Sequence, residues 1–227
     1  MNYEIVGSNM QSLKIELAEG EKVLADSGTL VSKSHGIVMV PRMAGGLGGF
    51  IAREITGATG LLTEFAAKGG PGHVSLAGIY PGKVFVVNLS EGETFVAERK
   101  AFLACDPSVK FTVQMMSVGA MWFGGAGIVM QKFVGPGRAF IHVVGDIIEY
   151  DVTDDKPIEI DPGHVAGYDG SLQYKITFVD NVRTAMFGGV GLFLAKFNGT
   201  GKVVTHSVSR QKLATQIYLD GQSQQKK

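Results

Sequence analysis

Two histidines are the residues whose type and spacing come closest to those of a metal site. His142 follows Gly137 by five residues and His206 follows Gly201 by five, so both occupy the same place in two similar stretches. One known arrangement of a metal site on a strand has a second histidine two residues after the first, which points the same way, and a carboxylate. The stretch after His142 lacks that second histidine, and Ala77 occupies the third equivalent place. We therefore interpret them as ordinary strand histidines and expect no metal or other cofactor.

No arrangement of nucleophile, base and acid stands out in the rest of the chain. Cys105 ends an apolar stretch, which is typical of a buried structural thiol. Asp154, Asp155 and Asp161 are expected to be solvated turn residues, because no second acidic pair is placed to act with them. The glycine-rich run at 45–49 lacks a following Lys-Ser or Lys-Thr and the strand–helix context of a phosphate-binding loop. The sequence therefore predicts a protein that is not an enzyme.

The charge balance argues against nucleic acid as a partner. The 227-residue chain has 21 basic and 21 acidic side chains and a formal net charge of zero at pH 7. Lys68, Lys132 and Lys196 recur beside similar turns, but a groove for single-stranded nucleic acid combines stacking aromatic side chains with positive charge. The aromatic residues here lie in apolar runs. We interpret these lysines as solvated hairpin ends.

Large apolar residues adjoin glycine pairs at three similar places, and these segments are the candidates for contact with a partner. They are Met43 and Leu47 in the first place, Met121, Trp122 and Phe123 in the second, and Met186 and Phe187 in the third. Methionine and aromatic side chains suit adaptable apolar surfaces. Three interpretations stay open for them: burial in the core, an interface between copies of the chain, and peripheral contact with a membrane.

An internal repeat indicates which elements position these residues. The pairs Gly124-Gly125 and Lys132-Phe133 and the glycines Gly135 and Gly137 return 64 residues later as Gly188-Gly189, Lys196-Phe197, Gly199 and Gly201. A more distant copy lies around Gly70, 65 residues before Gly135. In each copy two apolar runs flank a turn, which is typical of a β-hairpin. The turns are expected at Pro71 and Gly72, at Pro136 and Gly137, and at Gly199 and Gly201, with Gly137 in the positive-φ position of a type II turn.

The remaining sequence predicts strands with little helix. Leu13, Ile15 and Leu17 alternate with other residues, and residues 84–87 form a continuous apolar strand. Short helices are expected at 50–56 and 212–219, followed by a frayed tail at 222–227. Three units of about 13–88, 89–152 and 153–207, the second closed by a strand at 147–152, precede a C-terminal tail at 208–227. They predict a single all-β domain over 1–227, a barrel or rolled β-sandwich with pseudo-threefold symmetry.

Cysteine usage and hydropathy bear on location. Cys105 is the single cysteine and cannot form an internal disulfide, which favours a reducing compartment. The chain opens directly into strand-like sequence, so no secretory signal is expected. The longest uncharged apolar run, at 115–130, is glycine-rich and shorter than the roughly 20 residues of a membrane span. We expect a cytoplasmic protein of a prokaryote, with peripheral membrane contact as an alternative.

Several stretches, taken in order, resemble a known family. They are residues 29–31, 45–46, 69–77, 101–104 and 134–137. Together they resemble the mitochondrial biogenesis family named for altered inheritance of mitochondria, and the resemblance covers nearly the whole chain. It implies a double-stranded β-helix related in shape to the tryptophan RNA-binding attenuation protein, and oligomers. For eukaryotic members it implies a role at the mitochondrial inner membrane, whereas bacterial and archaeal members resemble proteins of unknown function. The family implies no catalytic residue.

These observations predict a non-enzymatic, all-β protein that forms homo-oligomers, a trimer or a multiple of it, through its apolar glycine segments. Two alternatives stay open. One is a cupin-like enzyme that binds a small molecule or a metal, with His142 and His206 as the metal-ligand candidates. The other is an RNA-binding module, for which the balanced charge is unfavourable.

Overall fold

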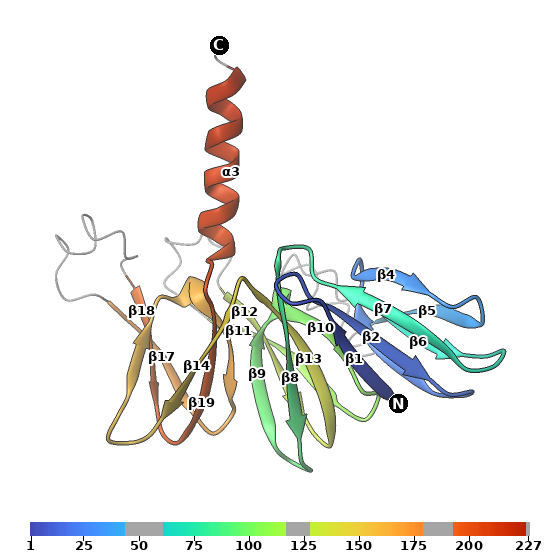
Figure 1. Cartoon of the computed structure of the whole chain (residues 1–227). Helices are drawn as coiled ribbons and strands as arrows, with labels where there is room; N and C mark the ends of the chain where they lie inside the picture. Colours follow the sequence, from blue (N-terminus) through green and yellow to red (C-terminus); the bar gives the residue numbers. More distant parts are fainter. Residues whose placement is uncertain (44–60, 117–127, 179–192, 226–227) are drawn as a thin grey trace.

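The strands form a row of stacked sheets, and one helix projects from the row (Figure 1). The computed structural model describes residues 1–43, 61–116, 128–178 and 193–225. Strand β1 (Asn2–Val6) precedes three groups of six strands, which we name the first, second and third units. The helix expected at 50–56 lies outside the described residues.

The first unit comprises β2 (Ser12–Leu17), β3 (Lys22–Asp26), β4 (Leu30–Lys33), β5 (Ile37–Met43), β6 (Leu61–Ala67) and β7 (Gly72–Ala77). The second comprises β8 (Gly82–Leu89), β9 (Thr94–Glu98), β10 (Phe102–Cys105), β11 (Lys110–Met116), β12 (Ile128–Val134) and β13 (Gly137–Val144). The third comprises β14 (Ile147–Val152), β15 (Ile158–Ile160), β16 (Val165–Asp169), β17 (Gln173–Phe178), β18 (Phe193–Asn198) and β19 (Gly201–His206). Helix α3 (Arg210–Gln225) follows, and short 3-10 turns span Arg99–Ala101 and Pro162–His164.

Four antiparallel sheets share these strands in a recurring order. Sheet A has the order β1-β2-β7-β4, and sheet D has the order β15-β18-β17. Between them lie sheet B, β5-β6-β3-β10-β13-β8, and sheet C, β11-β12-β9-β16-β19-β14, in which every strand number is six higher. Each six-stranded sheet therefore combines three strands of one unit with three strands of the next. The chain is all-β apart from α3 and the 3-10 turns in the part that the structure describes.

Three apolar cores lie between successive sheets. Leu13 and Val74 of sheet A pack with Phe65 and Phe140 of sheet B. In the same way one core joins sheets B and C, and another joins sheets C and D. In β2, Leu13, Ile15 and Leu17 are buried, as the alternation predicted. Each such side chain contributes about 1.5–3 kcal/mol when it leaves water.

The predicted hairpins are wrong, although the strands that would form them are present. β12 pairs with β11 and β9, whereas β13 pairs with β10 and β8. The turn between them therefore crosses from sheet C to sheet B rather than joining neighbours in one sheet. The same holds for β6 and β7 and for β18 and β19. The physical reason is that β13 has both faces buried, Phe140 toward sheet A and Ile141 toward sheet C, so it belongs to an inner layer.

Three expected boundaries differ from the structure. The strand order places the units at 12–77, 82–144 and 147–206, so the strand at 147–152 opens the third unit instead of closing the second. Helix α3 begins at Arg210 and reaches Gln225, well beyond the expected 212–219 and into the expected tail.

The glycine turns also differ among the units. Gly137 has a φ of 137° and follows a cis Gly135-Pro136 peptide bond. In the first and third units the positive φ lies instead at Gly70 and Gly199, two residues before the strand begins. Gly72 and Gly201, although predicted turn residues, are the first residues of β7 and β19.

Candidate self-assembly interface

The structure positions only one of the predicted apolar contact residues. Met43 is the last residue of β5, and its backbone is opposite Leu61 of β6. Leu47, Met121, Trp122, Phe123, Met186 and Phe187 lie outside the described residues. Each of the three glycine-rich segments connects the fourth strand of its unit to the fifth.

The two candidate metal ligands are buried at equivalent places, five residues after the first glycine of β13 and of β19. His206 Nδ1 accepts a hydrogen bond from the Val144 backbone N–H at 2.9 Å. Its Nε2 lies 3.5 Å from Glu98 Oε2 and finds no hydrogen-bond partner among the described residues. That carboxylate also pairs with Arg210, and burial lowers the pKa of His206 to about 4. Burial also lowers the pKa of His142. Both are therefore neutral packing residues at pH 7.

The described side chains do not assemble a metal site or a reactive thiol. Within these residues, no three His, Cys, Asp or Glu side chains gather where they could hold a metal ion. Cys105 is fully buried in β10, and burial raises the pKa of its thiol to about 12, so little thiolate forms near neutral pH.

A serine–histidine pair that the sequence analysis did not single out has a structural explanation. Ser34 Oγ lies 2.9 Å from His73 Nδ1 and accepts the His73 backbone N–H at 3.0 Å. In the second unit, Asp106 accepts the backbone N–H of Arg138 at 2.9 Å in the equivalent place. Asp169 does the same for Lys202 in the third unit. Ser34 therefore fills the place of an aspartate that holds the start of the unit's last strand.

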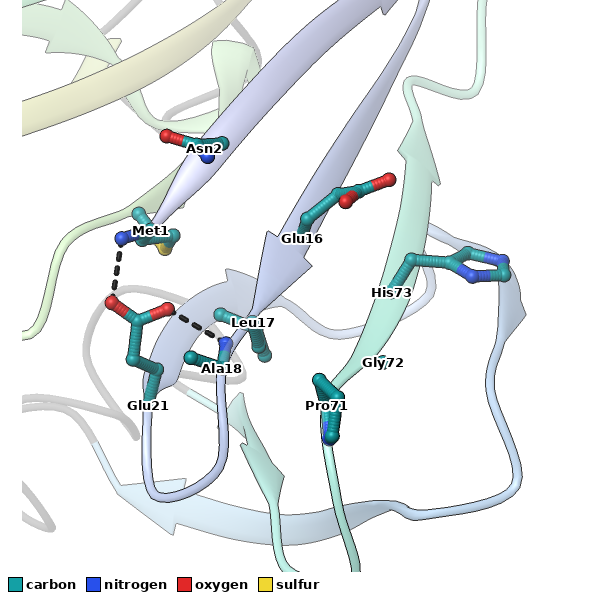
Figure 2. A pocket seen from close by; sticks show the side chains of 9 residues that line it. All are labelled: Met1, Asn2, Glu16, Leu17, Ala18, Glu21, Pro71, Gly72 and His73. Carbon is teal, nitrogen blue, oxygen red and sulfur yellow. Dashed lines mark hydrogen bonds and ion pairs between the residues drawn. The ribbon is translucent and has the colours of Figure 1, made fainter.

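A pocket of about 500 Å³ lies beside this pair (Figure 2). Glu16, Glu21 and His73 line it with the chain terminus at Met1. Figure 2 shows Glu21 turned toward Met1 and Ala18, with the His73 ring pointing away from that carboxylate. Glu21 binds the Met1 ammonium at 2.5 Å and the Ala18 backbone N–H at 2.8 Å. The polar groups of the pocket therefore do not converge on one point.

The units join through two strand pairs with the same register. In sheet B, Ala25 and Leu24 of β3 are opposite Ala104 and Cys105 of β10. In sheet C, Ala97 and Val96 of β9 are opposite Gly167 and Tyr168 of β16. The third strand of each unit also carries the same irregularity: β4, β10 and β16 each shift register by one residue against the last strand of their own unit. These shifts align Leu30 with Phe102 and Val165.

Two strands that are equivalent to the joining strands of sheets B and C lie at sheet edges. β4 is the third strand of its unit, like β10 and β16, and it ends sheet A. β15 is the second strand of its unit, like β3 and β9, and it ends sheet D. The two sheets lie at opposite ends of the row (Figure 1). Sheet D therefore corresponds to one half of sheet B, β5-β6-β3, and sheet A corresponds to the other half, β10-β13-β8. The same two halves are joined in sheet C.

The exposure of β4 departs from that of its equivalents. Val31 is 62% exposed, whereas Leu103 and Ala166, at the same place in β10 and β16, are fully buried. Leu30 is 36% exposed, whereas its equivalents Phe102 and Val165 are buried. Apolar side chains that are buried in β10 and β16, beside a strand of the preceding unit, are thus exposed in β4, next to which the described residues place no further strand.

Among the described residues, the ion pairs between helix α3 and the sheets lie at its first turn. Arg210 pairs with Glu98 of the second unit, and Lys212 with Asp161 of the third at 2.9 Å. Beyond this turn Ile217, Tyr218 and Leu219 are exposed, and the helix projects away from the sheets (Figure 1). Across the ranges that the structure describes, no helix has both the length and the apolar character to cross a bilayer.

Comparison with known proteins finds a matching family model, a bacterial relative and a similar crystal structure. The model of the mitochondrial biogenesis AIM24 family matches residues 3–208. An uncharacterised protein of Streptococcus pyogenes serotype M6 is 25% identical over 209 residues, which cover 89% of this chain and 83% of that protein. A crystal structure of a Streptococcus pyogenes protein, a structural genomics target, superimposes with a TM-score of 0.78 at 20% identity, covering 96% of this chain and 98% of that one. The similar structure supports the fold.

Proposed function

The chain belongs to the mitochondrial biogenesis AIM24 family, and from that premise we propose that it is a non-enzymatic scaffold that assembles with copies of itself. In this assembly, β15 of one copy pairs with β4 of the next. Sheet D of the first copy and sheet A of the second then form one continuous sheet, with the order β17-β18-β15-β4-β7-β2-β1.

The exposure of Leu30 and Val31 carries this proposal. Both are on a strand whose equivalents in the second and third units pair with a preceding unit and bury these positions. An unpaired edge with exposed apolar side chains is a template for another strand. A second copy supplies a fitting edge, because β15 is equivalent to the strands that fill this place inside the chain.

We further propose that the three units are copies of one module. The recurrence of strand order at intervals of six and the shared register shift support this interpretation. A stack of modules that passes three strands to its neighbour suits the double-stranded β-helix arrangement, with the shape of the tryptophan RNA-binding attenuation protein.

A head-to-tail interface closes into a ring when its rotation returns to the start. A ring has no free β4 or β15 edge, which removes the liability of an open sheet. We propose such a ring, with a trimer or a multiple of it as the expected size.

The assembly would bring the ends of the fourth strands of all units to one face. Strands alternate in direction along each unit, so β5, β11 and β17 all end at the side from which α3 leaves (Figure 1). A ring would repeat these ends on one face. The apolar glycine segments that follow them are our candidates for contact with a further partner or a membrane surface.

Sedimentation velocity over a range of concentrations tests the assembly. We expect oligomers for the wild type and monomers for Val31→Asp, because the charge would be buried where β15 of one copy meets β4 of the next. Ile217→Asp is the matched control, since Ile217 is 61% exposed and lies on the projecting part of α3. A monomeric wild type, or a Val31→Asp variant that assembles as well as the control, would contradict the proposal.

A further inference from the structure

We infer that an ion pair between Lys33 of one copy and Glu159 of the next determines which strand edges join and in which register. This inference rests on the assembly proposed above and names the residues that make it selective. A second copy of the chain is the partner, and complementary charge on the two open edges is the recognition chemistry.

The strand pairs that join units within the chain, β3 with β10 and β9 with β16, are the internal joints. Their register predicts the register of the joint between copies, in which β15 pairs with β4. Lys33 of β4 is opposite Val74 of β7, as Cys105 is opposite Ala139 and Tyr168 opposite Val203, so these three positions are equivalent. Inside the chain, Cys105 is opposite Leu24 and Tyr168 is opposite Val96.

The second strand of each unit aligns in the same way. Leu24 is opposite Glu64 of β6, Val96 opposite Lys132 of β12, and Glu159 opposite Lys196 of β18, one residue after the pairs made by Phe65, Phe133 and Phe197. Glu159 is therefore equivalent to Leu24 and Val96. The same register that joins the units inside the chain brings Lys33 opposite Glu159 between copies.

The environment of the two residues makes this pair selective. Lys33 is half-buried and shares its face of sheet A with buried Val74, its cross-strand partner. Glu159 is exposed at the edge of sheet D. The internal joints have uncharged residues in this place: Leu24 with Cys105, and Val96 with Tyr168. Unlike charges thus distinguish the joint between copies from the joints within a copy.

If the two strands paired in a shifted register, or if the wrong strands paired, Lys33 and Glu159 would not form an ion pair. A one-residue slip moves side chains to the opposite face of the sheet. Pairing β4 with another copy's β4 would leave both Lys33 side chains without a carboxylate opposite them, because β4 itself has no acidic residue. The pair therefore favours head-to-tail joining over both errors.

Charge reversal tests the inference in the full-length protein. We expect Lys33→Glu and Glu159→Lys each to weaken self-association by about tenfold or more, because attraction becomes repulsion. The double variant Lys33→Glu with Glu159→Lys should recover association, since each joint again has unlike charges. Lys100→Glu and Glu91→Lys are matched controls on exposed turns and should associate like the wild type.

Mixing the two single variants gives a sharper test. In a mixture, every joint between unlike copies combines opposite charges. At one kind of joint the two introduced residues meet, a glutamate at position 33 and a lysine at position 159, and at the other kind the native Lys33 meets the native Glu159. The mixture should therefore associate more strongly than either variant alone. This is expected even though the lysine introduced by Glu159→Lys would also face Lys196 within its own sheet.

The outcomes separate this inference from the proposed function. A wild type that remains monomeric would contradict the assembly itself. A wild type that assembles while both single variants assemble equally well would overturn the ion pair and leave the assembly standing. Loss of association in both variants without recovery in the double variant or the mixture would also overturn the pairing. Circular dichroism of each variant at low concentration verifies that the fold is kept.

Discussion

His206 shows how burial governs the chemistry of single residues in this protein. Its ring is 1% exposed, accepts a backbone N–H through Nδ1, and has a pKa lowered to about 4. The folded protein therefore keeps the ring neutral where the unfolded chain, with a pKa near 6.5, takes up a proton. Because the unfolded state binds more protons in this window, stability falls as the pH decreases from about 6.5 toward 4.

This linkage leads to a measurable pH dependence. Between neutral pH and pH 5, His206 should remove about 2 kcal/mol from the free energy of unfolding. His206→Asn can still accept the Val144 N–H but cannot take up a proton, so its stability should fall less over the same range. Urea unfolding at several pH values checks this difference. Equal pH slopes for the two proteins would show that His206 does not titrate as its burial requires.

Some properties of single residues could be predicted from the sequence, and others could not. The equivalence of His142 and His206 and the burial of Cys105 followed from spacing and neighbouring apolar residues. Ser34 was not identified as a turn-holding residue, because serine in the first unit corresponds to aspartate in the other two. A shared role carried by different residue types leaves little signal in one sequence.

Elements in equivalent places should respond differently to the same kind of substitution. Leu103 is fully buried in a joint inside the chain, so Leu103→Ala should cost about 2–5 kcal/mol of unfolding free energy. Val31 occupies the equivalent place on the open edge, and Val31→Ala should change the stability of the monomer by less than about 0.5 kcal/mol. Chemical unfolding below the concentration at which copies associate compares the two. Similar losses of unfolding free energy for the two variants would contradict the difference in burial between Leu103 and Val31.

Helix α3 is an element with little tertiary support beyond its first turn. Its ion pairs involve Arg210 and Lys212, whereas Ile217, Tyr218 and Leu219 are exposed. The part beyond the first turn, residues 214–225, has a length at which an isolated helix is marginal in water. Amides of residues 214–222 should therefore exchange hydrogen much faster than those of β10 or β13 in the unassembled protein. Strong protection there at low concentration would show that contacts within the monomer hold this part of α3, and it would contradict this account.

Strands were easier to predict than their partners. The alternation in β2 and the apolar runs of β12, β13, β18 and β19 identified the strands themselves. The glycine turns indicated hairpins, but the turns cross between sheets. Hydrophobic pattern indicates which faces are buried, whereas the choice between pairing in one sheet and crossing to the facing sheet depends on distant strands. Such long-range pairing leaves no local mark in the sequence.

At the scale of the whole molecule, the chain is a stack of sheets with an incomplete half at each end. In the ranges that the structure describes, sheet A has no strands equivalent to β5-β6-β3 of sheet B, and sheet D has none equivalent to β10-β13-β8. The repeat in the sequence indicated a pseudo-threefold scaffold and an oligomer. It did not indicate the edges, because β4 and β15 carry polar residues where their equivalents are apolar, and those differences weaken the resemblance between units.

Disulfide trapping across the joint tests the central claim most directly. The register of the internal joints brings Ser32 of one copy opposite Ile160 of the next, as Ala104 is opposite Ala25. Directly opposite residues of antiparallel strands bring their Cβ atoms to about 4.5–5.5 Å, near enough for a disulfide after small adjustment. Buried Cys105 has a pKa of about 12, so it should not compete.

The double variant Ser32→Cys with Ile160→Cys should form covalent oligomers on mild oxidation, resolved as a ladder on a non-reducing gel. Ser32→Cys paired with Glu91→Cys, which is exposed on a turn away from the joint, serves as the control and should form no ladder. If both double variants form the same products, or if Ser32→Cys with Ile160→Cys remains monomeric at concentrations where the wild type is assembled, the head-to-tail joining of β15 and β4 is wrong.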